Sequence, residues 1–190
     1  MLIFIAGLIL FFVPHTVSIV NEPWRNRMAE RLGEPIWKGI YSIIAIVGLV
    51  LIIQGYGMAR TDPTILYLPP LWANHLNWLL MLPIFPLLIA TYAPGHIRAL
   101  TRHPMLWATI IWAGGHLLAN GMLADLLLFG TFFIWAVADL ISMRRRIQRP
   151  LPELPATAAN DIIAVVGGLG IYAAFLFGLH GWLIGVPLMG

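Results

Sequence analysis

Residues 36–58 read IWKGIYSIIAIVGLVLIIQGYGM, a run with one charged side chain, Lys38, near its start. An α-helix rises about 1.5 Å per residue, so about 20 apolar residues cross a hydrocarbon core about 30 Å thick. This run is long enough to span a membrane. Five other segments qualify, at about 2–20, 72–93, 104–120, 122–142 and 161–186. We therefore predict an all-α, polytopic integral membrane protein with six transmembrane helices in one bundle.

The composition favours the same class. The chain is 60% hydrophobic and only 10% charged, which is outside the usual range for a soluble domain. The apolar runs are continuous and lack the ten-residue alternation of a transmembrane β-barrel. Because they occupy most of the 190 residues, we expect a single transmembrane domain over residues 1–190. The segment 2–20 has no small-residue cleavage site after it, so we interpret it as a retained helix.

The basic residues predict the orientation in the membrane. Ten of the eleven lysines and arginines lie in or beside the connectors after the first, third and fifth spans, and only Arg60 lies on the other side. Cytoplasmic connectors are enriched in Lys and Arg, so we expect a multi-pass protein of the inner (cytoplasmic) membrane with both termini periplasmic. This asymmetry explains the net charge of +3. We therefore expect membrane lipids, and no nucleic acid, among the partners.

Two histidines, His15 and His116, lie well inside apolar runs. Ionisable side chains within a bilayer are uncommon and usually mark function. His116 follows Trp112 by four residues on one helix face, and Gly114 and Gly115 leave space there for a bulky neighbour. Two histidines on different helices of a bundle can hold haem iron. His15 and His116 are therefore candidate metal ligands, and the absence of cysteine excludes a thiolate site.

The spacing also permits a second interpretation of these histidines. At about 1.5 Å per residue, His15 lies about 8–9 Å from the cytoplasmic boundary and His116 about 18–20 Å. A tilt, or a kink at Pro14, would be needed for both rings to reach one iron. Otherwise each ring is satisfied separately and only links helices. The remaining histidines are near span ends. Structural or interfacial roles are expected for His75, His96 and His180, whereas the role of His103 stays open.

The tripeptide Arg102-His103-Pro104 opens the fourth span at the predicted cytoplasmic face. Arg102 could bind a phosphate or carboxylate group, and His103 could orient it, so both are candidate cofactor-binding residues. Proline is also a favourable first residue of a helix, and Arg102 obeys the positive-inside rule. A purely topological role for the tripeptide therefore stays open.

Three further features concern packing. The connector 21–35, NEPWRNRMAERLGEP, should form an interfacial helix with Trp24 on the bilayer and its arginines toward phosphate head groups. Asp139 precedes a run of arginines and should pair with Arg146 or stabilise the helix end. Glycine and alanine residues between 170 and 185 should form a close-packing helix seam.

The chain resembles the NnrU family of membrane proteins over nearly its whole length. The strongest stretches are RLGEPIWKGIYS followed by GLVLIIQGYG, and RHPMLWATIIWAGGHLLANG continuing into LLLFGTFFIWAVADL. The family is associated with nitric-oxide and nitrite metabolism in denitrifying bacteria. The resemblance therefore implies a role in denitrification and, as possible partners, proteins of the nitrogen-oxide pathway.

The same stretches are similar to the zeta-carotene isomerase of plants and cyanobacteria, a haem-b membrane enzyme related to NnrU. That similarity implies haem b ligated between the first and fourth spans by His15, in HTVS, and His116, in IWAGGH. The isomerase also uses a cysteine three residues before its second histidine, and Ala113 stands at that position here. This difference argues against a ligand switch and against carotenoid isomerisation.

A more distant similarity runs to isoprenylcysteine methyltransferases and sterol reductases, which share the RHP motif. It implies a lipidic small-molecule substrate and a cofactor contacted by Arg102 and His103. Three hypotheses follow: a haem protein of nitrogen-oxide metabolism, a membrane enzyme acting on a lipidic or isoprenoid substrate, and a haem-free scaffold.

Overall fold

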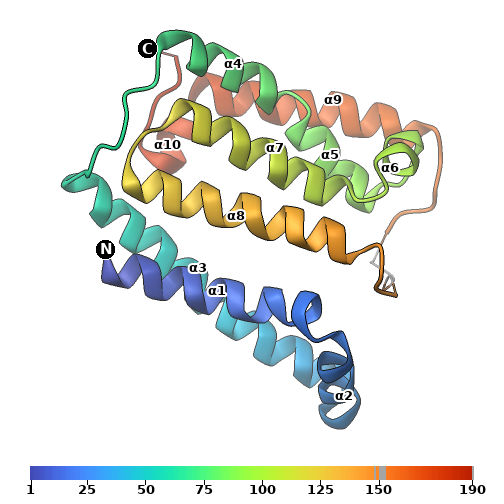
Figure 1. Ribbon diagram of the computed structural model, residues 1–190. Coiled ribbons are helices and arrows are strands. Elements are labelled where there is room, and N and C mark those ends of the chain that lie inside the picture. Colours follow the sequence, from blue (N-terminus) through green and yellow to red (C-terminus); the bar gives the residue numbers. More distant parts are fainter. Residues whose placement is uncertain (148, 150–152, 190) are drawn as a thin grey trace. The chain divides into compact units, whose positions relative to one another are not determined.

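A computed structural model describes residues 1–147, 149 and 153–189 of the chain. These residues form helices, turns and loops without a β-strand, so the all-α prediction is confirmed. The helices divide into two compact units. Unit 1 comprises Met1–Leu68 and Asn120–Ile147, and unit 2 comprises Pro69–Ala119 and the described residues after 147. Figure 1 shows the helices of each unit by label and colour.

Five helical segments in the described residues are long and apolar enough to cross a membrane. They are Leu2–Val20, Glu34–Thr61, Leu71–Tyr92, Leu123–Ser142 and Ala159–Ile184. The remaining predicted span is α7 (Pro104–Ala119), an apolar helix of 16 residues. The chain therefore has the helices of a membrane protein. The crossing by α7 and the single six-helix bundle remain predictions.

Unit 1 is built on the antiparallel pair α1 (Leu2–Val20) and α3 (Glu34–Thr61). Glycines allow the two backbones to touch: a Cβ atom at Gly55 would lie 2.5 Å from the Phe4 backbone, and one at Gly48 would lie 2.5 Å from the Phe11 nitrogen. The short helix α2 (Glu22–Leu32) joins them, which confirms the predicted helix within 21–35. Its position at the membrane interface remains a prediction.

Helix α8 (Leu123–Ser142) completes unit 1 and packs against α1. Its first turn is held by Asp125, which is 1% exposed. The Asp125 carboxylate accepts hydrogen bonds from the Tyr56 hydroxyl at 2.6 Å and from the Met122 backbone N–H at 3.0 Å. Both carboxylate oxygens thus have donors, which a fully buried acid requires.

Unit 2 contains α4 (Leu71–Met81), α5 (Ile84–Tyr92), α6 (His96–Thr101), α7 and α9 (Ala159–Ala174). The third predicted span is two helices, α4 and α5, separated at Pro83, because proline cannot continue the backbone hydrogen bonds of the preceding turn. After α9 the chain forms a π-helical turn (Phe175–Leu179) and then α10 (His180–Ile184).

The predicted seam between residues 170 and 185 is not where the helices of unit 2 meet. Gly170 and Gly178 face open space, with no neighbouring atom within 4 Å of the position that a Cβ would take. The close contact is made by Gly168, whose Cβ would collide with the Pro86 ring of α5. Gly168 lies about 200° around the helix from Gly170, so the seam prediction chose the wrong face.

Candidate functional site

His15 lies in the second half of α1, directly after Pro14, and is half-buried. Its Nδ1 donates a hydrogen bond to the Phe11 carbonyl oxygen one turn earlier, at 2.6 Å. The Phe11 ring stacks on the imidazole with 4.3 Å between centroids. Tyr41 of α3 and Trp135 of α8 also border the ring, at 4.9 and 5.8 Å. Three helices of unit 1 therefore meet around this histidine.

Asp139 provides a buried charge beside His15 and the aromatic rings that border it. It follows Trp135 by one helical turn on α8, and its carboxylate acts electrostatically on both His15 and Tyr41. Asp139 pairs with Arg146, which confirms the predicted ion pair, and it also accepts a hydrogen bond from the Ser142 hydroxyl at 3.2 Å. Within a bilayer a carboxylate needs such a partner, because an isolated buried charge is costly.

His116 lies near the end of α7 and repeats the local arrangement of His15. Its Nδ1 donates to the Trp112 carbonyl oxygen at 2.8 Å, and the Trp112 ring is 5.3 Å away. A carbonyl oxygen can only accept, so in both residues Nδ1 carries the proton. A neutral ring in this tautomer has its lone pair on Nε2. Histidines that ligate metals commonly hold their other nitrogen in this way.

The space at Gly115 is not available to a cofactor. The Asn77 carbonyl oxygen and the Met81 methyl group of α4 occupy the position where a Cβ atom would lie. The Asn77 oxygen is buried with no hydrogen-bond partner among the described residues, and it lies 2.4 Å from the position that a Gly115 Cβ would take. At Gly115 the predicted space beside His116 therefore holds side chains of α4.

The two candidate ligands belong to different parts of the structure. His15 is in unit 1 and His116 is in unit 2. Within each unit, the ring is oriented by its own helix and bordered by aromatic side chains. The described residues contain no group of three or more His, Asp or Glu side chains that could hold a bare metal ion. A haem needs fewer protein ligands, because the porphyrin supplies the equatorial nitrogens and the protein only the axial ones.

Arg102 stands out by its backbone. It is the one described non-glycine residue with a positive φ, at 61°. The His103 N–H donates to the Thr101 carbonyl at 2.7 Å, closing a tight three-residue turn around Arg102. This turn is rare and strained for an L-residue. The Arg102 side chain is exposed, and His103 accepts the first backbone hydrogen bonds of α7 with its carbonyl oxygen.

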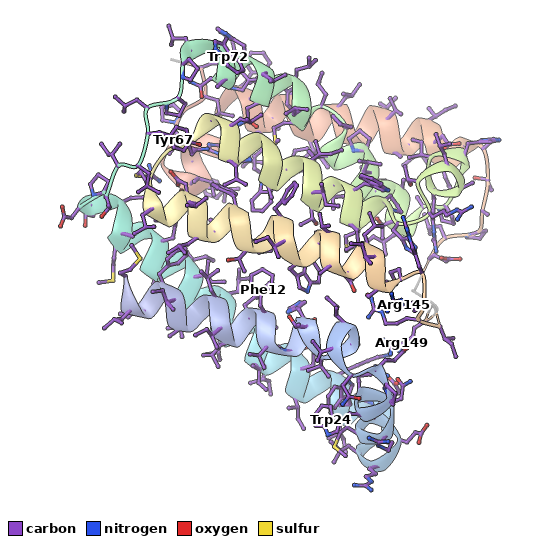
Figure 2. The ribbon with its side chains drawn as sticks, in the orientation of Figure 1. Phe12, Trp24, Tyr67, Trp72, Arg145 and Arg149 are labelled. Carbon is purple, nitrogen blue, oxygen red and sulfur yellow. The ribbon has the colours of Figure 1, made fainter. Side chains whose placement is uncertain are left out.

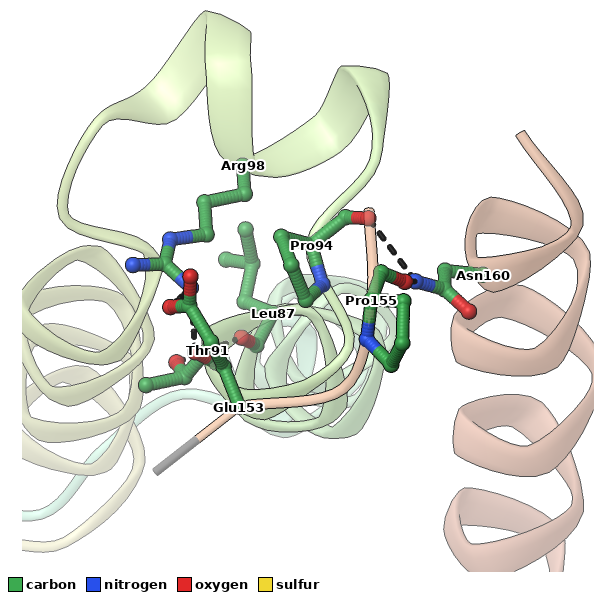
Figure 3. A network of polar contacts seen from close by, with 7 residues as sticks. All are labelled: Leu87, Thr91, Pro94, Arg98, Glu153, Pro155 and Asn160. Atoms are coloured by element: carbon green, nitrogen blue, oxygen red, sulfur yellow. Dashed lines mark hydrogen bonds and ion pairs between the residues drawn. The ribbon is translucent and has the colours of Figure 1, made fainter. Parts of the chain in front are cut away.

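An open pocket of about 560 Å³ lies close to this turn in unit 2, but Arg102 and His103 do not line it. Arg98 does: its guanidinium donates to the Thr91 carbonyl at 3.1 Å and pairs with Glu153 (Figure 3). Asn160 of α9 donates to the carbonyl oxygens of Pro94 and Pro155, at 2.8 and 2.9 Å (Figure 3). These bonds attach the segment that enters α9 to the turn between α5 and α6.

The other histidines have local partners. His96 is exposed and its Nδ1 lies 2.9 Å from Asp161, which also accepts the His96 and Ile97 backbone N–H groups. The His180 Nδ1 donates to the Val186 carbonyl at 2.7 Å. His75 is exposed and contacts Trp78 with its ring. These contacts agree with structural or interfacial roles.

Sequence reasoning missed Tyr41 and Trp135, the aromatic residues around His15. A signal existed for one of them, since Trp135 and Asp139 are four residues apart and therefore share a face of α8. Tyr41 gave no such signal. Its proximity to His15 depends on the register of α3 against α1, which the glycine contacts set.

One of the comparisons with known proteins found a match. The model of a protein family described as "NnrU protein" matches residues 3–188. No curated protein and no solved structure matches the chain.

Proposed function

The chain belongs to the NnrU family, and on this premise we propose that it is a membrane protein that binds haem b and serves nitric-oxide and nitrite metabolism. His15 and His116 are the proposed axial ligands. Bound haem would supply reversible one-electron chemistry or gas binding at its iron. The protein would then act as a sensor, a redox partner or a maturation factor in the inner membrane.

The observation that supports this proposal is that the imidazole rings of His15 and His116 have the same tautomer and the same backbone hydrogen bond. Both donate Nδ1–H to the carbonyl four residues earlier, at 2.6 and 2.8 Å. In this tautomer a histidine that binds iron does so through Nε2. The flat Phe11 ring and the Tyr41 ring beside His15 offer apolar surface of the kind that a porphyrin covers.

An absorption spectrum of the purified protein tests the proposal. The protein, made with ample haem supply, should show sharp visible bands on reduction. We expect His15→Ala and His116→Ala each to remove or shift these bands, while His75→Ala, a change at an exposed histidine, leaves them intact. A featureless wild-type spectrum would refute haem binding. Unchanged bands in both variants would refute the ligand assignment alone.

A second candidate function rests on Arg102. Strained backbone is retained where the surroundings or the function require it, and the strain here falls on an exposed arginine. This favours a membrane enzyme in which Arg102 binds an anionic cofactor or substrate group and His103 orients it, with a lipidic or isoprenoid substrate. Within this alternative, Ala113 makes a reductase or transferase a better fit than an isomerase that depends on a cysteine ligand.

One variant, Arg102→Ala, distinguishes the haem-binding function from the enzyme function. If Arg102 acts in an enzyme, Arg102→Ala should abolish turnover of a lipidic substrate and leave any haem spectrum intact. Arg145→Ala, which removes another exposed arginine, is the matched control. Equal turnover in wild type and Arg102→Ala would exclude this use of Arg102.

A further inference from the structure

An open apolar groove of about 420 Å³ runs along α1 and ends at the start of α2. Its lining includes Ile9, Val13, Val17 and Val20 of α1, and then Asn21 and Trp24. Thr16 also lines it, but the Thr16 hydroxyl is already bonded to the Phe12 carbonyl at 2.7 Å. The groove therefore offers no unsatisfied polar group along its length.

The length of the groove matches a lipid chain. From Ile9 to Val20 the helix rises about 16 Å, close to half of a hydrocarbon core about 30 Å thick. Val13 and Val20 are 58% and 78% exposed, so the groove opens sideways from a membrane-spanning helix. In Figure 2 Phe12 lies on α1 and Trp24 lies beyond the end of α1, on α2.

The mouth of the groove presents hydrogen-bond donors. The Asn21 side-chain oxygen accepts from the Trp24 backbone N–H at 3.0 Å, which leaves the Asn21 amide N–H groups as donors. Beyond them, Arg27 and Arg31 follow Trp24 at three and seven residues and lie on the same face of α2. At 100° per residue, Glu22 falls on the far side of α2 from the two arginines, whereas Glu30 lies 60° from Arg27, at the edge of this face.

Arg27 and Arg31 are exposed, and neither is paired with another described residue. Arg25 on the same helix differs, since it is buried and pairs with Glu34 at 3.0 Å while lying over the Trp37 ring. Like charges four residues apart on a helix repel each other. An anion bound between Arg27 and Arg31 would remove that repulsion and bring charge-assisted hydrogen bonds.

We propose that this groove and the two arginines form a binding site for an anionic phospholipid. One acyl chain occupies the groove along α1, and the phosphate group binds Arg27 and Arg31 with Trp24 at the level of the head group. An apolar channel one leaflet deep that ends in unpaired cations is complementary to a lipid, whereas a free phosphate would leave the channel empty. The site lies wholly within unit 1 and does not depend on haem.

Native mass spectrometry of the detergent-purified full chain tests this site. The protein is titrated with phosphatidylglycerol and, separately, with phosphatidylcholine. In the double variant Arg27→Gln/Arg31→Gln we expect phosphatidylglycerol affinity to fall about 30-fold, from the usual contribution of two basic residues near an anionic head group. The matched control Arg144→Gln/Arg145→Gln removes two exposed arginines that do not line the groove and should change affinity less than about twofold.

A second pair of variants tests the groove itself. Val17→Trp fills the groove and should weaken phosphatidylglycerol binding, whereas Val47→Trp, on an exposed face of α3, should not. Circular dichroism verifies that all variants keep their helix content. Equal phosphatidylglycerol affinity in the Arg27/Arg31 variant and its control would overturn the proposal. Unchanged binding in Val17→Trp, or displacement of the lipid by inorganic phosphate alone, would indicate a head-group anion site without a chain groove and would also overturn it.

Discussion

Arg102 has a backbone conformation that glycine adopts at little cost and that an L-residue with a side chain resists. Its φ of 61° closes the turn between α6 and α7, and the His103 N–H bond to Thr101 holds it there. Strain of this kind costs about 1–3 kcal/mol. An exposed arginine therefore stands where glycine would adopt the backbone at lower cost.

We predict that Arg102→Gly stabilises the protein. Relief of the strained turn should raise the free energy of unfolding by about 1 kcal/mol, offset in part by the greater freedom of glycine in the unfolded chain. The change is measured as a higher midpoint of thermal unfolding in detergent. Leu100→Gly, two residues earlier on α6 and 87% exposed, is the control and should lower the midpoint. A lower midpoint in Arg102→Gly would show that its side chain stabilises the turn.

In His15 and His116 the orientation and tautomer of the imidazole are set by the helix that carries it. In both, the ring turns back toward the helix N-terminus and donates Nδ1–H to the carbonyl one turn earlier. At this scale the two are alike. His15 also meets aromatic rings from two other helices of unit 1, α3 and α8.

At the scale of elements, the pair α1–α3 depends on which glycines face the partner helix. Gly48 and Gly55 are seven residues apart and therefore share a face of α3, and both touch the backbone of α1. Gly39 and Gly57 of the same helix face open space. Small residues at a helix contact allow the close packing that drives association in lipid, where the hydrophobic effect between helices is weak.

Substitution of two glycines on α3 should therefore have opposite effects. Gly55→Ala places a methyl group 2.5 Å from the Phe4 backbone and should lower the free energy of unfolding by about 1–3 kcal/mol. Gly57→Ala meets no neighbour and should raise it by about 0.5–1 kcal/mol through helix propensity. Unfolding in sodium dodecyl sulfate, followed by circular dichroism, measures both. If both variants lose stability equally, the α1–α3 contact is not made at Gly55.

The same reasoning explains the error in the last span. The small residues from 170 onward would permit another helix to approach closely, but no helix of unit 2 does so at Gly170 or Gly178. Gly168 makes the contact instead, because the Pro86 ring of α5 projects at that level. A glycine pattern indicates possible seams, and the partner helix decides which of them is used.

For the whole molecule, the distribution of arginines predicts the sidedness of every connector. Because the chain has no cysteine, single cysteines can be introduced and labelled without background. With a membrane-impermeant maleimide added to intact cells or spheroplasts, we expect Leu68→Cys and Asn120→Cys to react. Leu100→Cys and Arg145→Cys should react only after the membrane is opened. All four positions are in connectors or at the short helix α6.

The labelling of Leu100→Cys and Asn120→Cys also tests α7. If this 16-residue helix crosses the membrane, the two positions lie on opposite sides. Labelling of both from the same side would show that α7 does not span, and it would leave five crossings. A reversed pattern at all four positions would refute the predicted orientation.

The membrane class and the ends of some helices were accessible from the amino-acid sequence because they depend on local properties. The predicted span 2–20 coincides with α1, and the predicted span 122–142 differs from α8 by one residue. A run of apolar residues forms a helix in lipid whatever its neighbours, since its backbone must satisfy its own hydrogen bonds. The pair Asp139–Arg146 was predictable for the same reason, because Arg146 follows Asp139 by seven residues, just beyond the end of α8.

The candidate site shows where this local information ends. His15 and His116 are visible in the sequence, yet Tyr41 and Trp135 become neighbours of His15 only through the packing of α3 and α8 on α1. The sequence does not distinguish Gly115 from Gly57, yet Asn77 packs against Gly115 and no atom lies within 4 Å of a Cβ position at Gly57. The strained φ of Arg102 is likewise set by the helices on either side of it. Contacts between residues distant in sequence depend on register and rotation of whole helices, and only the folded chain contains that information.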